Sequence, residues 1–169
     1  MKLPSEALNK IGKRVYFNVG SDISDYNSRC GFRLSNYGFL LKVNETAEVI
    51  RTQEICQIPG TPEWFMGIAN QRGILFPVFN LFDFFKIDNK QCNDWILYFG
   101  EGSKAVGIKI NQLPVIVVKI NKKDKYLDYK DKTPDFLLPY IIDAYNYNGS
   151  IWYNISFDKL FMSMHESFV

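Results

Sequence analysis

The residue types that most often carry metal or nucleophilic chemistry are few and scattered in this chain. His165 is the only histidine, and it lies in the last segment. Cys30, Cys56 and Cys92 are far apart and include no Cys-x-x-Cys pair. The sequence therefore offers neither the ligand spacing of a thiolate zinc site nor a cysteine–histidine dyad. We expect no metal site and no bound cofactor.

The carboxylates and glycines do not form a catalytic pattern either. Asp83 and Asp88 follow an apolar strand, and three further aspartates lie among lysines near residues 122–132, so no acid–base pair is evident. The glycines of "FGEGSKAVG" (99–107) lack the spacing of a phosphate-binding loop, and they lie between two strands rather than before a helix. The chain is not expected to be an enzyme.

Arg72 is a cation in a largely apolar stretch of the sequence. Arg72 lies in "GIANQRGILFPVFN" (67–80), between a small flexible turn and a strand that is almost entirely apolar. Such a strand belongs inside a protein, whereas an arginine reaches water or a partner. A guanidinium group can hold a carboxylate or backbone carbonyls through two parallel hydrogen bonds. These residues alone leave the role of Arg72 open.

Composition limits the classes of protein to which this chain can belong. Its 169 residues suffice for one domain or two small lobes that fold together, and 47% hydrophobic residues supply a substantial core. A formal charge of +2 lacks the basic excess of most nucleic-acid-binding proteins. No signal peptide and no run of about 18 apolar residues is evident, so we expect a cytoplasmic protein with reduced thiols.

Short apolar runs separated by turn residues fill the chain from Cys30 onward, and this pattern predicts a mainly β protein built as barrels or a sandwich. Residues 1–29 differ and are expected to form a short helix and a surface linker. The predicted elements after them are two strands around Ser35–Asn36, a helical turn and strand over 44–51, an irregular break at Pro59–Gly60, a buried strand over 73–80 that passes into a short helix near Asp83, a hairpin over 94–110 turning at Glu101–Gly102, a strand over 114–120, a hairpin over 140–156 turning at Asn148–Gly149, and a closing helix over 157–168.

Several segments carry a resemblance to a known family. Three of them are short motifs, "AEV" (47–49), "IPGTPEWFMGIANQRG" (58–73) and "LFPVFNL" (75–81). Two longer segments follow, "WILYFGEGSKAVGIKINQLPVIVVKI" (95–120) and "GSIWYNISFDKLF" (149–161). In this order they resemble the CheW-like coupling domain, the adaptor of bacterial chemosensory arrays. "GFRL", "AEVI", "IPGTPEW" and "GIANQRG" most resemble the adaptors of systems that control type IV pili and twitching motility.

The resemblance implies two small five-stranded β-barrel lobes packed together, with an apolar groove between them. Lobe 1 would span approximately 30–85 plus the C-terminal segment, and lobe 2 approximately 92–150. It also implies two partners: the cytoplasmic tip of a methyl-accepting chemoreceptor, and the regulatory domain of a CheA-type histidine kinase. No nucleic acid and no membrane insertion is implied.

The resemblance also assigns partner-binding residues: Glu48, Val49, Gly67, Asn70 and Arg72. Gly67 lets another backbone approach closely, Asn70 belongs to the turn that projects Arg72, and Val49 would supply an apolar floor for a helix. Simpler roles stay open. Arg72 could be an ordinary surface arginine, Glu48 a solvated carboxylate at the end of a helical turn, and Val49 a core residue.

Two positions depart from the family pattern. Asn80 and Asn111 stand where the family usually has aspartate. Asparagine can still satisfy a turn through its side chain, so we expect the fold to survive while any role of negative charge at these positions is lost.

A second class of function remains open, namely an OB-type barrel that binds single-stranded nucleic acid. It rests on the lysines and tyrosines interleaved over residues 122–132. The near-neutral net charge and the mixed charges of that stretch argue against it.

Overall fold

The computed structural model describes residues 15–17, 29–43, 45, 47–51, 55–89, 95–117 and 125–167. The helix expected before residue 15 and the linker expected over 18–28 lie outside these residues, as do residues 122–124 of the lysine-rich stretch. Within them the fold is mainly β, as predicted, and its strands form two sheets.

The first sheet contains six strands in the order β1-β4-β7-β8-β6-β5, and the second contains five in the order β10-β11-β3-β2-β9. Neighbours are antiparallel except for the parallel pairs β6–β8 and β3–β11. The bounds are β1 Val15–Phe17, β2 Arg29–Leu34, β3 Tyr37–Leu40, β4 Ala47–Arg51, β5 Phe65–Gln71, β6 Ile74–Phe79, β7 Trp95–Phe99, β8 Val106–Ile110, β9 Val115–Val117, β10 Ile141–Tyr147 and β11 Ser150–Ile155. In the described part of the chain, two α-helices accompany them, α2 Leu81–Phe85 and α3 Phe157–Glu166.

The two sheets interleave along the sequence instead of dividing it into consecutive ranges. β2 and β3 belong to the sheet that also holds β9, β10 and β11, whereas β7 and β8 pair with β4 and β6. The ranges expected for the lobes, 30–85 and 92–150, therefore do not coincide with the two sheets. Sequence patterns locate strands, but they do not say which strands pair across long connections.

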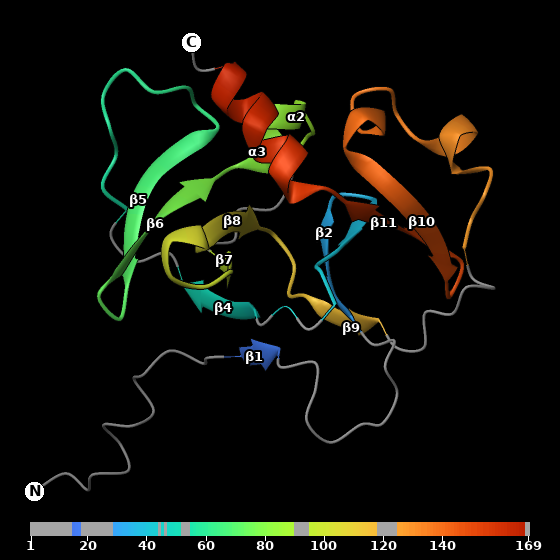
Figure 1. Cartoon of the computed structure of the whole chain (residues 1–169), viewed down its shortest axis with the longest axis horizontal. Helices are drawn as coiled ribbons and strands as arrows, with labels where there is room; N and C mark the ends of the chain where they lie inside the picture. Colours follow the sequence, from blue (N-terminus) through green and yellow to red (C-terminus); the bar gives the residue numbers. More distant parts are fainter. Residues whose placement is uncertain are drawn as a thin grey trace, which may run out of the picture.

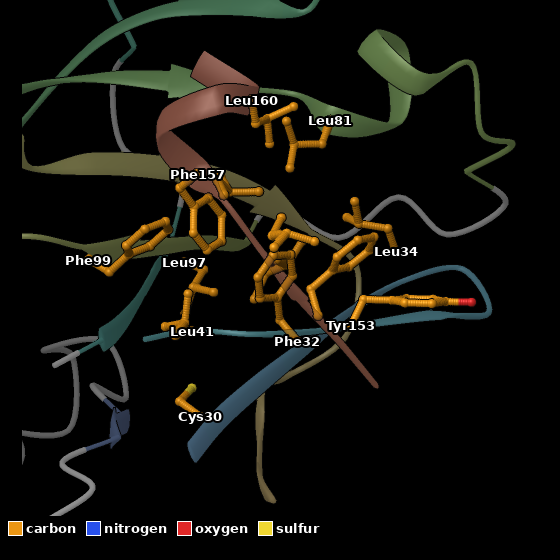
Figure 2. Packing of buried hydrophobic residues seen from close by; sticks show 14 of the residues in the cluster. Cys30, Phe32, Leu34, Leu41, Leu81, Leu97, Phe99, Tyr153, Phe157 and Leu160 are labelled. Atoms are coloured by element: carbon orange, nitrogen blue, oxygen red, sulfur yellow. The ribbon is translucent and has the colours of Figure 1, made fainter. Parts of the chain in front are cut away.

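Helix α3 lies between the two sheets (Figure 1). The main hydrophobic core contains residues of both sheets and of this helix. Phe157, Leu160 and Met164 of this helix are buried there. The ring of Phe157 lies 5.1 Å from that of Phe99 on β7, and Figure 2 shows Leu160 facing Leu81. The C-terminal helix thus ties the second sheet, which it follows in sequence, to the first.

A smaller core fills the other face of the first sheet. It contains Ala69, Phe76, Val78, Ile96 and Ala105. Because β4, β6, β7 and β8 contribute to one core or both, this sheet is apolar on its two faces. That burial explains the nearly continuous apolar runs in its strands.

The predicted hairpins are confirmed, and their turns use the expected residues. Asn148 and Gly149 both have positive φ, 51° and 73°, as a two-residue type I′ turn requires. Ser35, between β2 and β3, has φ 54°.

The expectation that the strand after Gly73 is buried was wrong for its first two residues, because Leu75 is 68% exposed and Ile74 is exposed as well. β6 enters the core only from Phe76 onward.

Asn80 performs the structural role expected of an aspartate, and it adds a contact that aspartate cannot make. Its side-chain oxygen accepts a hydrogen bond from the Phe82 backbone N–H at the start of α2, at 3.2 Å. Its Nδ2 donates to the Asp83 carboxylate at 2.5 Å. The helix is therefore capped and Asp83 is paired.

We predict that Asn80→Asp destabilises the protein by about 1 kcal/mol or more, because the donor to Asp83 is replaced by a second carboxylate. Denaturant unfolding measures the change. The double variant Asn80→Asp/Asp83→Asn restores a donor–acceptor pair and should regain most of the loss. Equal stability of the wild type and the single variant would contradict this role of the amide.

Candidate functional site

The β5–β6 hairpin ends in a tight turn at Arg72 and Gly73. Both residues have positive φ, 53° and 84°, and the Gly73 backbone N–H donates to the side-chain oxygen of Asn70 at 2.9 Å. A left-handed conformation at a residue other than glycine costs about 1–3 kcal/mol. Glycine or asparagine would fit this position at lower cost, so the arginine is retained at a cost that its interactions must offset.

The Arg72 side chain extends to β4 and contacts Glu48 there. Its Nη2 lies 3.4 Å from Oε1 of Glu48 on β4, and Nε2 of Gln71 lies 3.4 Å from the same oxygen. In the strand order β1-β4-β7-β8-β6-β5, β5 is the last strand, and β7, β8 and β6 lie between it and β4. The two side chains at the hairpin tip therefore connect β4 with the end of β5, two strands that are not neighbours in the sheet.

Burial differs sharply between the two members of this ion pair. The Glu48 side chain is 7% exposed and that of Arg72 is 51% exposed. A buried carboxylate needs a cation and hydrogen bonds to offset its lost hydration, and the hairpin tip supplies both. The Arg72 guanidinium group thus contacts Glu48 while about half of the side chain is exposed to solvent. The exposed part can bind a partner's carboxylate.

Glu48 lies on a strand, so the alternative of a solvated carboxylate at a helix end is wrong. Residues 44 and 46, where the preceding helical turn was expected, lie outside the described residues. Val49, the next residue on β4, is fully buried in the main core. Its side chain supports the strand from inside and does not reach the surface.

Gly67 does allow a close backbone approach, but the approaching backbone is this chain's own. Its φ is +128°, and a Cβ placed there would lie 2.2 Å from the carbonyl oxygen of Cys56. Cys56 and Ile68 exchange backbone hydrogen bonds of 2.8 and 3.0 Å. The segment around Cys56 therefore lies along the edge of β5, and Gly67 is required by that packing.

Beside the hairpin lies an open apolar depression that the sequence patterns did not indicate. Its volume is about 560 Å³, and its lining residues are Ile55, Cys56, Ile68, Ala69, Asn70 and Leu75. The exposed Leu75 could have been noticed, because it follows a turn at a hairpin tip, where polar residues are usual. Arg72, Asn70 and this depression together form a surface that we call the hairpin surface.

A separate groove lies between the two sheets, at the beginning of α3. Its volume is about 570 Å³. Its apolar residues are Leu41, Phe99, Val106, Phe157 and Phe161, and its charged residues are Lys42, Glu45, Glu101, Lys104 and Asp158. None of the five predicted partner-binding residues lines this groove. The structure thus brings together Glu48, Arg72 and Asn70 near the hairpin tip, away from the groove, while Val49 and Gly67 serve the packing around them.

The described residues contain no group of three or more His, Cys, Asp or Glu side chains arranged to hold a metal ion. Burial raises the pKa of the Cys30 thiol to about 12, which leaves it protonated and poorly nucleophilic at neutral pH. None of the helices in the described part of the chain has the length and apolar character that a membrane span requires.

Three comparisons relate this chain to known proteins. The model of the CheW-like domain family matches residues 30–164. The crystal structure of the scaffolding protein TtCheW from Thermoanaerobacter tengcongensis superposes with a TM-score of 0.65 and covers 82% of this chain and 89% of that one. Its sequence is 20% identical, so this likeness concerns the fold.

The third comparison is closer in sequence but shorter. Protein PilI from Pseudomonas aeruginosa is 37% identical over 57 residues, which are 34% of this chain and 32% of PilI. The match therefore spans about a third of the relative's length. β1 lies outside the residues that the family model matches.

We predict that Gly67→Ala destabilises the protein by several kcal/mol, because an unfavourable φ is combined with a contact that the Cys56 backbone cannot relieve, and strained conformations alone cost about 1–3 kcal/mol. Gly60→Ala is the matched control. Gly60 also has positive φ, +80°, but a Cβ there has nothing within 4 Å. Denaturant unfolding compares the two, and equal losses would contradict the importance of the close approach.

Proposed function

The chain belongs to the CheW-like domain family, and from this premise we propose that it is a non-enzymatic adaptor that couples a methyl-accepting chemoreceptor to a CheA-type histidine kinase. The observation that carries the proposal is the hairpin surface. It combines a half-exposed arginine held by a buried carboxylate with an adjoining apolar depression. This is the chemistry that a helical receptor tip with an acidic residue and apolar neighbours would fit.

The arrangement favours binding over catalysis. Arg72 is fixed in position by Glu48 and by the turn that Asn70 closes, so little conformational freedom is lost when a partner arrives. Leu75 and Ile68 offer apolar area beside it. An adaptor needs no more than this, because it acts by holding receptor and kinase in a defined geometry, and weak individual contacts gain strength when many are engaged in an array.

The pathway that we propose is the control of type IV pili and twitching motility. The similarity to PilI supports it. Of the motifs that resemble the pilus-control adaptors, "GIANQRG" builds the end of β5 and the hairpin tip, and "IPGTPEW" directly precedes β5. The adaptor would work in the cytoplasm, recruited to membrane-associated receptors. The kinase would contact a different face of the molecule, so that both partners are held at once.

The ion pair determines which variant tests this proposal cleanly. Charge reversal, Arg72→Glu, would bring a second carboxylate to the buried Glu48 and so disturb the fold as well as the surface. Arg72→Gln keeps an amide donor near Glu48 and avoids a second carboxylate, but it removes the cation that Glu48 faces, so denaturant unfolding first verifies that the variant is folded. Leu75→Asp changes an exposed residue of the depression without entering the core.

We predict that Arg72→Gln and Leu75→Asp each weaken binding to a soluble cytoplasmic fragment of the cognate receptor by about tenfold, the loss of one charge-assisted hydrogen bond or of one apolar anchor. Isothermal titration calorimetry measures it. Lys130→Gln, which removes an exposed charge on the second half of the chain, is the matched control and should bind normally.

Val106→Asp separates this surface from the groove between the sheets. If Val106→Asp abolishes receptor binding while both hairpin variants bind normally, the receptor occupies the groove and the proposed surface is wrong. If the wild type binds no receptor fragment, the proposed function itself is wrong.

A further inference from the structure

The six-stranded sheet ends in a strand that the family domain does not include. β1, Val15–Phe17, pairs antiparallel with β4, and Figure 1 shows it lying alongside that strand. The family model begins at residue 30. Without β1 the sheet would have five strands, and β4 would be its edge.

The register places β1 beside the candidate site. Val15 is opposite Val49, Tyr16 opposite Glu48, and Phe17 opposite Ala47. Partner residues of an antiparallel pair have Cα atoms about 4.5–5.5 Å apart. The backbone of Tyr16 therefore lies next to that of Glu48, the residue to which Arg72 is anchored.

The two neighbours of β4 are held to very different extents. β7 pairs with β4 over five residues and is itself paired with β8, whereas β1 pairs over three residues and has no second neighbour in the sheet. Few ladder hydrogen bonds and a position at the edge are typical of segments that open locally at low cost. β1 is thus the neighbour that can leave while the sheet stays intact.

An open β4 edge would offer its unpaired backbone groups to another chain. It would also uncover the edge of the strand that carries Glu48, the residue to which Arg72 is anchored. We infer that β1 is an intramolecular strap, which covers the β4 edge and competes with the receptor for the surface around Glu48 and Arg72. This inference rests on the proposed function, because the receptor is the partner with which β1 competes.

The size of the effect follows from the population of the open form. A partner that binds only when β1 is detached has its apparent affinity reduced by the fraction of molecules that are open. If roughly a tenth to a third of the molecules are open, releasing the strap tightens binding by about three- to tenfold.

The test uses the full chain with β1 disabled by Tyr16→Pro/Phe17→Pro. Consecutive residues of a strand direct their N–H groups to opposite sides, so the double variant removes a donor toward β4 whichever residue provides it. Asn9→Pro/Lys10→Pro introduces the same residues in the same N-terminal segment outside β1 and serves as the control. Hydrogen exchange at the amides of residues 47–51 reports the pairing, and calorimetry with the receptor fragment reports affinity.

We expect the β1 variant to exchange faster at β4 and to bind the receptor fragment about three- to tenfold more tightly, while the control matches the wild type in both measurements. Tighter binding by Val15→Gly/Phe17→Gly, a milder change, would show that the gain does not depend on proline. Normal receptor binding by the wild type with no gain in either variant would overturn the strap while leaving the proposed function in place. Unchanged exchange at β4 would overturn it as well. Absence of binding by every version would refute the proposed function and the strap with it.

Discussion

The buried carboxylate of Glu48 is the constraint on which this site depends. It lies on β4 inside a sheet that is apolar on both faces, so it must be given a cation and hydrogen bonds from the same molecule. The β5–β6 hairpin supplies them through Arg72 and Gln71, and the turn accepts an unfavourable backbone conformation at Arg72 in order to do so. The ion pair thereby connects β4 with the hairpin that ends β5 and holds the arginine at the surface. One interaction serves both the fold and the candidate binding site.

The remaining features of the first sheet are arranged around the Glu48–Arg72 ion pair, which we call the clamp. Gly67 brings the Cys56 segment against β5 and so forms one wall of the apolar depression beside Arg72. Asn70 closes the turn, and Val49 anchors β4 in the core beneath it. β1 covers the other edge of the same strand. Membership of the CheW-like domain family and the geometry of the clamp thus support one account, in which a rigid surface at the end of one sheet meets a partner.

Local patterns predicted the elements well, because turn chemistry and apolar periodicity act over a few residues. Asn148–Gly149 and Ser35 mark their hairpins, and the closing helix is where its pattern places it. The pairing of strands and the ion pair were not predictable in this way, since both join residues distant in sequence. Glu48 and Arg72 were both assigned to partner binding only through the family resemblance, and their contact with each other was not predicted. Leu75 was misread because an apolar residue at a hairpin tip looks like the start of a buried strand.

The most direct test of the central claim is to map the receptor's footprint by nuclear magnetic resonance. Backbone amide shifts of the full chain would be followed as a soluble receptor fragment is added. The account predicts that the largest changes fall on residues 68–75 and 47–51, which carry the hairpin surface and β4. Changes confined to the groove between the sheets, at Leu41, Lys42, Phe99, Glu101 and Val106, would contradict it.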